Sequence, residues 1–188
     1  MSQGHLECIF GCMYAGKSEE LIRKIRRAEI AQKKAIIFKP KIDNRYDEND
    51  VVSHSGLKAE AVPIYSEKQI LSIYKNFGPF DIVAIDEAQF FDEDLFEIID
   101  ILLEKEVTVI ATGLNQDFRG QGFGIMPELI ARADKTIHLT AVCQVCGEEA
   151  TKTQRLLNNK PAPFDSETVI VGGKEQYEAR CKNCYERG

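Results

Sequence analysis

Short apolar runs alternate with amphipathic segments along the first 113 residues. Four runs are short and rich in aliphatic and β-branched residues, as expected of buried strands: 5–10, 35–39, 81–86 and 107–113. Three segments carry apolar residues at helical spacing: 18 to about 34, 66–77 and 92–106. This alternation predicts an α/β fold with a parallel sheet and helices on its faces.

The pattern changes near residue 140. The polar stretch 40–56 is expected to be a loop within the α/β part, whereas the segment after 140 has short β-prone runs, turn-forming residues and two Cys-x-x-Cys pairs. We predict two domains, an α/β domain over residues 1–140 and a small C-terminal domain over 141–188.

The junction between the first strand and the first helix carries a phosphate-binding pattern. Gly11, Gly16, Lys17 and Ser18 fit the spacing G-x-x-x-x-G-K-[ST]. In such a loop the backbone N–H groups and the helix N-terminus form a cradle for anions, the lysine reaches the β- and γ-phosphates, and the serine ligates Mg²⁺. A chance Gly-Lys turn is the alternative, but it would not need the strand–loop–helix context. The predicted nucleotide contacts are Gly11, Cys12, Met13, Tyr14, Ala15, Gly16, Lys17 and Ser18.

A second anion for the metal is expected at the end of a neighbouring strand. Asp86 follows four apolar residues, and Glu87 comes directly after it, at the carboxyl edge of the sheet where open α/β folds bind ligands. We assign Asp86 to Mg²⁺ and Glu87 to the general base, because a carboxylate that holds a metal is a poor proton acceptor. The alternative is that both acids only cap the helix that begins near Asp92.

Four late cysteines form two pairs, CQVC and CKNC. Soft thiolate ligands in this arrangement predict a closed, tetrahedral and therefore structural zinc site; the ligands are Cys143, Cys146, Cys181 and Cys184. Disulfides and an iron–sulfur centre remain alternatives.

Charge and hydropathy limit the remaining classes of protein. The net charge of −6 argues against a mainly electrostatic nucleic-acid binder. No apolar run is long enough to span a bilayer, and the first ten residues lack the pattern of a secretory signal, so we expect no membrane partner and a cytoplasmic location.

Taken together, these motifs resemble the type II thymidine kinase family. The resemblance rests on GCMYAGKSEEL (11–21), IDEAQFF (85–91), GLNQDFRGQGFG (113–124), LTAVCQVCGEEATKTQRL (139–156) and VIVGGKEQYEARCKNC (169–184), and it covers nearly the whole chain. It implies a RecA-like P-loop domain with a zinc-stabilised lasso that covers the nucleoside. The implied reaction transfers the ATP γ-phosphoryl group to the 5′-hydroxyl of thymidine, or of deoxyuridine, in pyrimidine deoxynucleoside salvage. Homotetramers and feedback inhibition by dTTP are also implied.

The resemblance also implies roles for individual residues. Glu87 matches the general base, Asp86 the acid associated with Mg²⁺, and Gln89 a glutamine on the nucleotide side. Lys17 is expected to act on the phosphates, and Arg155 matches an arginine near the active site. The side chains that would enclose the nucleoside are Met13, Phe90, Leu114, Phe118 and Phe123. The lasso positions near the base are Thr153, Thr168, Val169, Ile170, Val171, Gly172, Gly173 and Tyr177.

Three other functions are alternatives to this one. An ATP-driven nucleic-acid motor conflicts with the acidic charge and the short chain, and a nucleotide-dependent switch would need neither Glu87 nor a lasso. A kinase of the same fold acting on another nucleoside is the third, because backbone groups that read a base leave little trace in the sequence.

Overall fold

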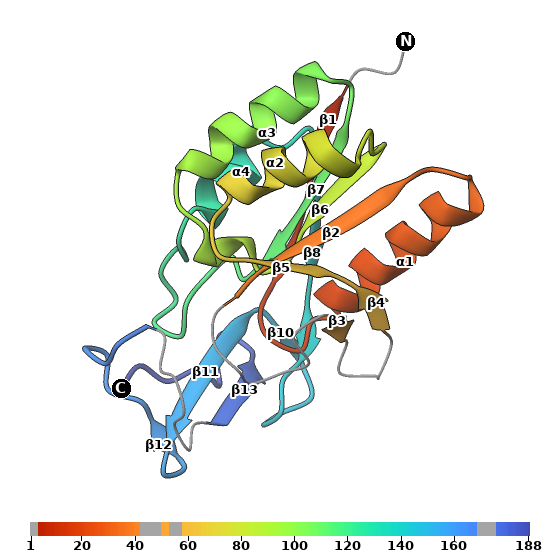
Figure 1. Cartoon of the computed structure of the whole chain (residues 1–188). Coiled ribbons are helices and arrows are strands. Elements are labelled where there is room, and N and C mark those ends of the chain that lie inside the picture. The colour runs from red at the N-terminus through yellow and green to blue at the C-terminus, as the bar shows by residue number, and fades with distance from the viewer. Residues whose placement is uncertain (1–3, 42–49, 53–57, 169–175) are drawn as a thin grey trace.

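The structure is a computed structural model that describes residues 4–41, 50–52, 58–168 and 176–188. Its main feature is a parallel sheet of six strands in the order β5-β2-β6-β7-β1-β8 (Figure 1). The strands are β1 (His5–Gly11), β2 (Ala35–Pro40), β5 (Val62–Ile64), β6 (Ile82–Ile85), β7 (Thr108–Gly113) and β8 (Lys135–Leu139). Parallel strands place all their carboxyl ends at one edge of the sheet, and the predicted phosphate loop and Asp86 lie at this edge.

Helices cover both faces of the sheet, as the sequence predicts. They are α1 (Lys17–Ile30), α2 (Lys68–Phe77), α3 (Asp94–Glu104) and α4 (Met126–Arg132). Figure 1 shows α1 on one face and the other three helices on the opposite face. All four residues of β6 are buried, with Val83 and Ile85 in the core under α3 and with Ile82 and Ala84 in the core under α1. The period of two along a strand sends alternate side chains into the two cores.

The predicted strands and helices of the α/β part are confirmed, with small changes at their ends. Helix α1 ends at Ile30 rather than near residue 34, because Gln32 adopts a left-handed backbone conformation with φ of 59°. The polar stretch 40–56 contains the short strand β3 (Asp50–Val52), which pairs with β4 (Lys58–Glu60).

Besides β3 and β4, three further elements were absent from the prediction: β5, α4 and β8. Each is short, and β8 is an edge strand whose side chains are exposed or half-buried, so its hydrophobic alternation is weak.

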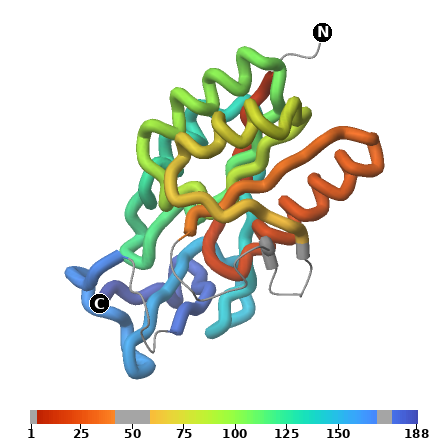
Figure 2. Tube along the Cα trace, viewed as in Figure 1, coloured from red at the N-terminus to blue at the C-terminus, as the bar shows by residue number. Residues whose placement is uncertain are grey.

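The C-terminal part of the chain forms small antiparallel sheets. Strands β9 (Ala141–Val142) and β10 (Glu149–Ala150) pair with each other, and β11 (Lys152–Leu157) lies between β12 (Lys160–Pro161) and β13 (Gln176–Arg180). Figure 2 shows the C-terminal strands next to the turn that joins β1 to α1. The division into domains at residue 140 stays a prediction. Among the residues described, no helix is both long and apolar enough to cross a membrane.

Candidate functional site

The phosphate loop lies where the sequence places it, between the end of β1 and the start of α1. A Cβ at Gly11 would lie 2.1 Å from the carbonyl oxygen of Leu139, at the end of β8, so only glycine fits there. Gly16 has φ of 85°, which suits glycine as the residue before the helix. The Lys17 ammonium donates a hydrogen bond to the Cys12 carbonyl oxygen at 2.9 Å, which closes the loop on itself.

Asp86 follows β6 directly and is buried. The register pairs Ile85 of β6 with Ala111 of β7, so the next residues, Asp86 and Thr112, lie side by side, and the Thr112 hydroxyl donates to Asp86 Oδ1. Burial and, secondarily, the charge of Glu87 raise the pKa of Asp86 to about 6. Such a carboxylate is stabilised by any cation that comes near it.

The Lys17 side chain is close to these acids. Burial lowers the pKa of its ammonium group, and the charges of Glu87 and Asp86 act in the opposite direction. The phosphate loop and the acidic end of β6 therefore face a common space, as the P-loop interpretation requires.

Glu87 has a backbone conformation that is rare for a residue with a side chain. Its φ is 52° and its ψ is 44°, and it precedes the 3-10 turn η1 (Ala88–Phe90). Strain of this kind persists where the surroundings hold it, and it is concentrated at functional sites. The held group here is the carboxylate, which accepts a hydrogen bond from the Gln89 amide.

Gln89 links this acid to the next strand. Its Oε1 accepts the Leu114 N–H at 3.1 Å, while its amide nitrogen donates to Glu87. A Cβ on Gly113 would lie 2.4 Å from Gln89 Oε1, so the glycine at the end of β7 leaves room for this bridge. The buried glutamine thus positions Glu87, in addition to the nucleotide-side role that the resemblance implies.

The glycine-rich loop 113–124 carries Phe118 and Phe123, which lie in different surroundings. Phe123 packs edge-on against Phe90 with ring centroids 5.4 Å apart. Phe118 is buried, and the Arg155 guanidinium lies 3.9 Å from its ring centroid. Arg155, itself 1% exposed, also donates to the Glu167 carbonyl at 2.6 Å. These contacts hold Phe118 from the side of β11.

A second arginine joins the same loop to the C-terminal part. Asp117 is buried and accepts hydrogen bonds from the Arg119 backbone N–H and from Arg119 Nε, at 2.9 and 2.8 Å. The other end of this guanidinium donates to the Thr168 hydroxyl at 2.8 Å. Thr168, a predicted substrate residue, is therefore tied to the loop that carries Phe118.

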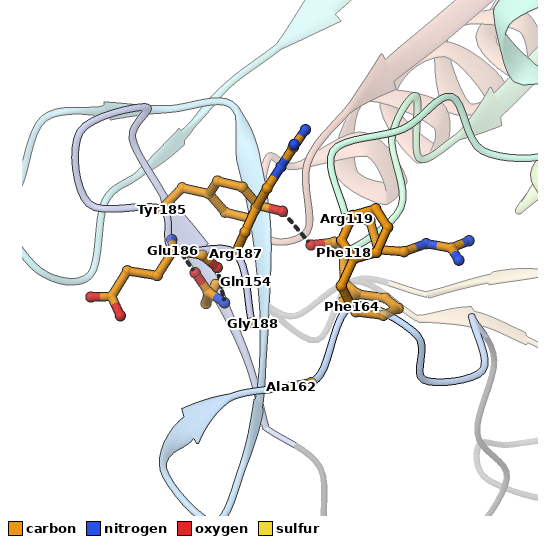
Figure 3. Close-up of a pocket in the computed structure, with 9 residues that line it drawn as sticks. All are labelled: Phe118, Arg119, Gln154, Ala162, Phe164, Tyr185, Glu186, Arg187 and Gly188. Carbon is orange, nitrogen blue, oxygen red and sulfur yellow. Dashed lines mark hydrogen bonds between the residues drawn. The ribbon is translucent and has the colours of Figure 1, made fainter.

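A further contact to the loop 113–124 is made at the backbone carbonyl of Phe118 and is drawn in Figure 3. The Tyr185 hydroxyl donates to it at 2.7 Å. The following residue, Glu186, is held by the buried Gln154, which accepts its N–H at 2.9 Å and donates to its carbonyl at 3.0 Å. The segment after the last cysteine thus supports the loop that contains Phe118.

The remaining predicted substrate residues fall into two groups. Thr153 and Tyr177 lie against the phosphate loop, since the Thr153 hydroxyl accepts the Met13 N–H and the Tyr177 carbonyl accepts the Tyr14 hydroxyl. The predictions for Val169, Ile170, Val171, Gly172 and Gly173 fall outside the described residues.

The four late cysteines converge, as predicted. Their Sγ atoms all lie within 4.8 Å of one another, and those of Cys146 and Cys181 are 3.6 Å apart. Zinc–sulfur bonds of about 2.3 Å in a tetrahedron separate sulfurs by about 3.8 Å, so the donor set fits this ion. All four cysteines are free, which removes the disulfide alternative.

Cys8 and Cys12 belong to other surroundings. Burial raises the pKa of Cys8 to about 12, and burial likewise raises the pKa of Cys12. The Cys12 thiol donates to the Ala150 carbonyl at 3.3 Å. Both behave as packed thiols rather than reactive thiolates.

Several supporting residues were not predicted from the sequence: Thr112, Asp117, Arg119, Gln154 and Tyr185. Only Thr112 had a usable signal, because a hydroxyl at the carboxyl end of a buried strand next to the strand that leads to Asp86 is expected to face that acid. The others act through contacts between distant segments, which a single sequence does not reveal.

The site thus combines a phosphate loop, two acids at the end of the neighbouring strand and a four-cysteine cluster, which defines a P-loop phosphotransferase with an added metal-binding part. The family model described as thymidine kinase matches residues 4–185. The chain belongs to the thymidine kinase family, whose members are ATP-dependent phosphotransferases that phosphorylate thymidine. The sequence-based interpretation of the family, the reaction and the fold is confirmed.

Proposed function

We propose that Glu87 is the general base that accepts the proton of the thymidine 5′-hydroxyl as the γ-phosphoryl group of ATP is transferred to it. The observation that carries this assignment is the strained backbone of Glu87 beside the phosphate loop, with its carboxylate held by Gln89. A fixed carboxylate at the carboxyl edge of the sheet can accept a proton from a sugar hydroxyl without first reorienting.

The phosphate loop and Lys17 bind and orient the phosphates. In the structure the ammonium group donates to the Cys12 carbonyl. We infer that it exchanges this partner for phosphate oxygens when ATP binds, because a buried ammonium gains more from an anionic acceptor than from a neutral one.

The resemblance implies Mg²⁺, and we propose that Ser18 and Asp86 hold it. The oxygen donors suit this ion, and the buried Asp86 carboxylate beside a second acid favours a cation. Bound there, Mg²⁺ would neutralise phosphate charge. Thr112 orients Asp86 by donating to one of its oxygens.

For Arg155, the contacts support a positioning role. Its guanidinium lies on the Phe118 ring and binds the Glu167 carbonyl, so it holds the loop that would enclose the nucleoside. In the same way, Arg119 and Tyr185 support the proposal that residues 141–188 border the nucleoside site.

We further propose deoxyuridine as a second substrate, a homotetrameric assembly and inhibition by dTTP, all on the strength of the family resemblance. Four thiols gathered as metal ligands are typical of a reducing compartment, which supports a cytoplasmic location.

The test is ATP- and Mg²⁺-dependent phosphorylation of a panel of nucleosides, with ADP release followed in parallel. We expect ADP release that depends on thymidine and deoxyuridine and is small with purine nucleosides. Hydrolysis of ATP without any nucleoside, especially if stimulated by DNA or RNA, would contradict the proposal.

The role of Glu87 is tested by Glu87→Gln. Loss of a positioned general base lowers kcat by about 10²- to 10⁴-fold, whereas ADP binding stays close to that of the parent protein. Glu93→Gln, on an exposed acid just before α3, is the matched control and is expected to leave kcat unchanged. Near-normal turnover by Glu87→Gln would remove this residue as the base.

A further inference from the structure

Three successive residues of the phosphate loop each contact a different strand of the C-terminal part. The Cys12 thiol donates to the carbonyl of Ala150 on β10, at 3.3 Å. The Met13 N–H donates to the hydroxyl of Thr153 on β11, at 3.0 Å. The Tyr14 hydroxyl donates to the carbonyl of Tyr177 on β13, at 3.1 Å. The loop is therefore held from outside as well as by β1 and α1.

The contacts of Cys12 and Thr153 are better protected from solvent than that of Tyr14. Thr153 is 4% exposed and Cys12 is 2% exposed, whereas Tyr14 is 40% exposed. A hydrogen bond to a buried acceptor is costly to lose, because removal of the Thr153 hydroxyl leaves the half-buried Met13 N–H without this partner.

The loop has a specific need for this support. Tyr14, directly after Met13, has φ of 66°, a left-handed conformation that costs energy for a residue with a Cβ. The contact of Met13 lies directly before this strained position, and the contact of Tyr14 is made by the strained residue itself. They fix the direction in which the loop turns toward Ala15, Gly16 and Lys17.

The same region is connected to the lysine. Cys12 uses its thiol on β10 and its carbonyl on the Lys17 ammonium, so a shift of the C-terminal strands is transmitted to both ends of the loop. Ala15 also packs against the small buried cluster formed by Cys12, Cys143, Ala150, Ala179 and Cys181.

From this geometry we propose that Thr153 is a positioning residue for the phosphate loop, so that the four-cysteine part contributes to ATP binding and not only to nucleoside binding. The inference rests on the proposed ATP site. It gives Thr153 a role that differs from the nucleoside contact implied by the resemblance, because its hydroxyl faces the Met13 amide.

The experiment measures ADP binding by calorimetry in the absence of nucleoside, with three variants. Thr153→Val keeps the shape and removes the acceptor, and we expect ADP affinity to fall about fivefold to tenfold. Thr153→Ser keeps the hydroxyl and restores most of the affinity. Thr151→Val changes a half-buried threonine nearby, between β10 and β11, and leaves ADP affinity unchanged.

Steady-state kinetics supply a second readout. In Thr153→Val we expect the KM for ATP to rise more than the KM for thymidine. We expect kcat to fall much less than it would on loss of a catalytic group. If Thr153→Val is too unstable to study, Cys12→Ala tests the same support from β10, and we expect a twofold to fivefold loss of ADP affinity.

Two results would overturn the inference. Thr153→Val that binds ADP as tightly as the parent protein, with only the KM for thymidine raised, would make Thr153 a nucleoside contact alone. An equal loss in Thr153→Ser would show that the hydroxyl is not what matters. Failure of the parent protein to bind ADP at all is a different outcome, since it would contradict the proposed function itself.

Discussion

The two parts of the chain that meet at the site have cores of different kinds. On the two faces of the parallel sheet, large aliphatic side chains fill two buried clusters, with Ile85 and Leu95 in one and Leu21 in the other. The cluster in the C-terminal part consists of alanines and cysteines, one of them supplied by the phosphate loop. Burial of apolar area stabilises a fold by about 25 cal/mol per Å², so small side chains contribute little. We therefore expect the first part to be stable through its own core and the second to depend on the metal ion that its four cysteines can hold.

The two parts also position functional groups in different ways. Asp86 and Lys17 are placed by the ends of regular elements, because the strand register and the start of α1 fix where their side chains begin. Phe118 and Thr168, by contrast, lie outside regular elements and are held by side chains from distant segments, among them Tyr185 and Arg119. Functional geometry at the sheet edge should therefore tolerate more disturbance than geometry that depends on contacts between the C-terminal part and loop 113–124.

Removal of the metal should break this comparison most strongly. Zinc held by thiolates contributes about 10 to 16 kcal/mol of apparent binding energy in small modules, which far exceeds what the alanine and cysteine cluster supplies. After chelation we expect amides of β11 and β13 to lose protection from hydrogen exchange by orders of magnitude, while β6 and β7 remain protected.

Adding zinc back is the control, and it should restore protection together with activity. Unchanged protection in β11 after metal analysis has shown complete removal would mean that the C-terminal part is stable by its own packing, and the contrast between the two parts would be wrong.

The second largest effect is expected from Asp86→Asn, which should raise the stability of the fold and abolish activity. Because burial, with the charge of Glu87, raises the pKa of Asp86 to about 6, the carboxylate opposes folding when ionised. The favourable protonated state is fully present below the unfolded pKa of 3.8 and is lost as the pH rises through about 6. In the absence of Mg²⁺, Asp86→Asn should stabilise the protein by about 1 to 3 kcal/mol above pH 7 and progressively less toward pH 5.

Urea unfolding between pH 5 and 8 measures this difference, with Asp92→Asn as the control on an exposed acid. The same Asp86→Asn variant should be inactive. The carboxylate would then be needed for activity although it lowers the stability of the fold. A variant no more stable than the parent protein at pH 7.5 would show that the sheet edge carries no such penalty.

The smallest expected effect concerns the support of Phe118. Tyr185→Phe removes only the hydroxyl that binds the Phe118 carbonyl, and the loss of one partly buried hydrogen bond is worth about 1 kcal/mol. We expect the KM for thymidine to rise about fivefold, with ADP affinity unchanged. Tyr65→Phe, on a side chain that is 77% exposed, serves as the control. A change in ADP affinity with no change in the KM for thymidine would contradict the placement of Tyr185 on the nucleoside side of the site.

The predictable features share one property, which is that their signal lies in a short stretch of sequence. The phosphate loop needs only the spacing of its glycines and Lys17 between an apolar run and a helical pattern. Asp86 needs only a buried strand in front of it, and the cysteines need only their pairing. Each of these was found, because local chemistry and element type determine them.

The features that were missed depend on contacts between segments far apart in the chain. Gln154 binds Glu186, and Tyr185 binds the carbonyl of Phe118, across 32 and 67 positions. The left-handed backbone of Glu87 could not be predicted either, because nothing in IDEAQFF demands a positive φ. Such features follow from the assembled fold rather than from local preference.

The place of β1 in the sheet has a consequence for how the chain is made. This strand begins at residue 5, yet its neighbours are β7 and β8, which end at residues 113 and 139. Ribosomes add about 5 to 20 residues per second, so β1 waits for several seconds before either neighbour exists. Pairing over such sequence separations is slow, and the apolar strand that leads to the phosphate loop stays exposed meanwhile. We therefore expect the nucleotide site to be among the last features of the sheet to form, with β1 exposed to aggregation in the unfinished chain.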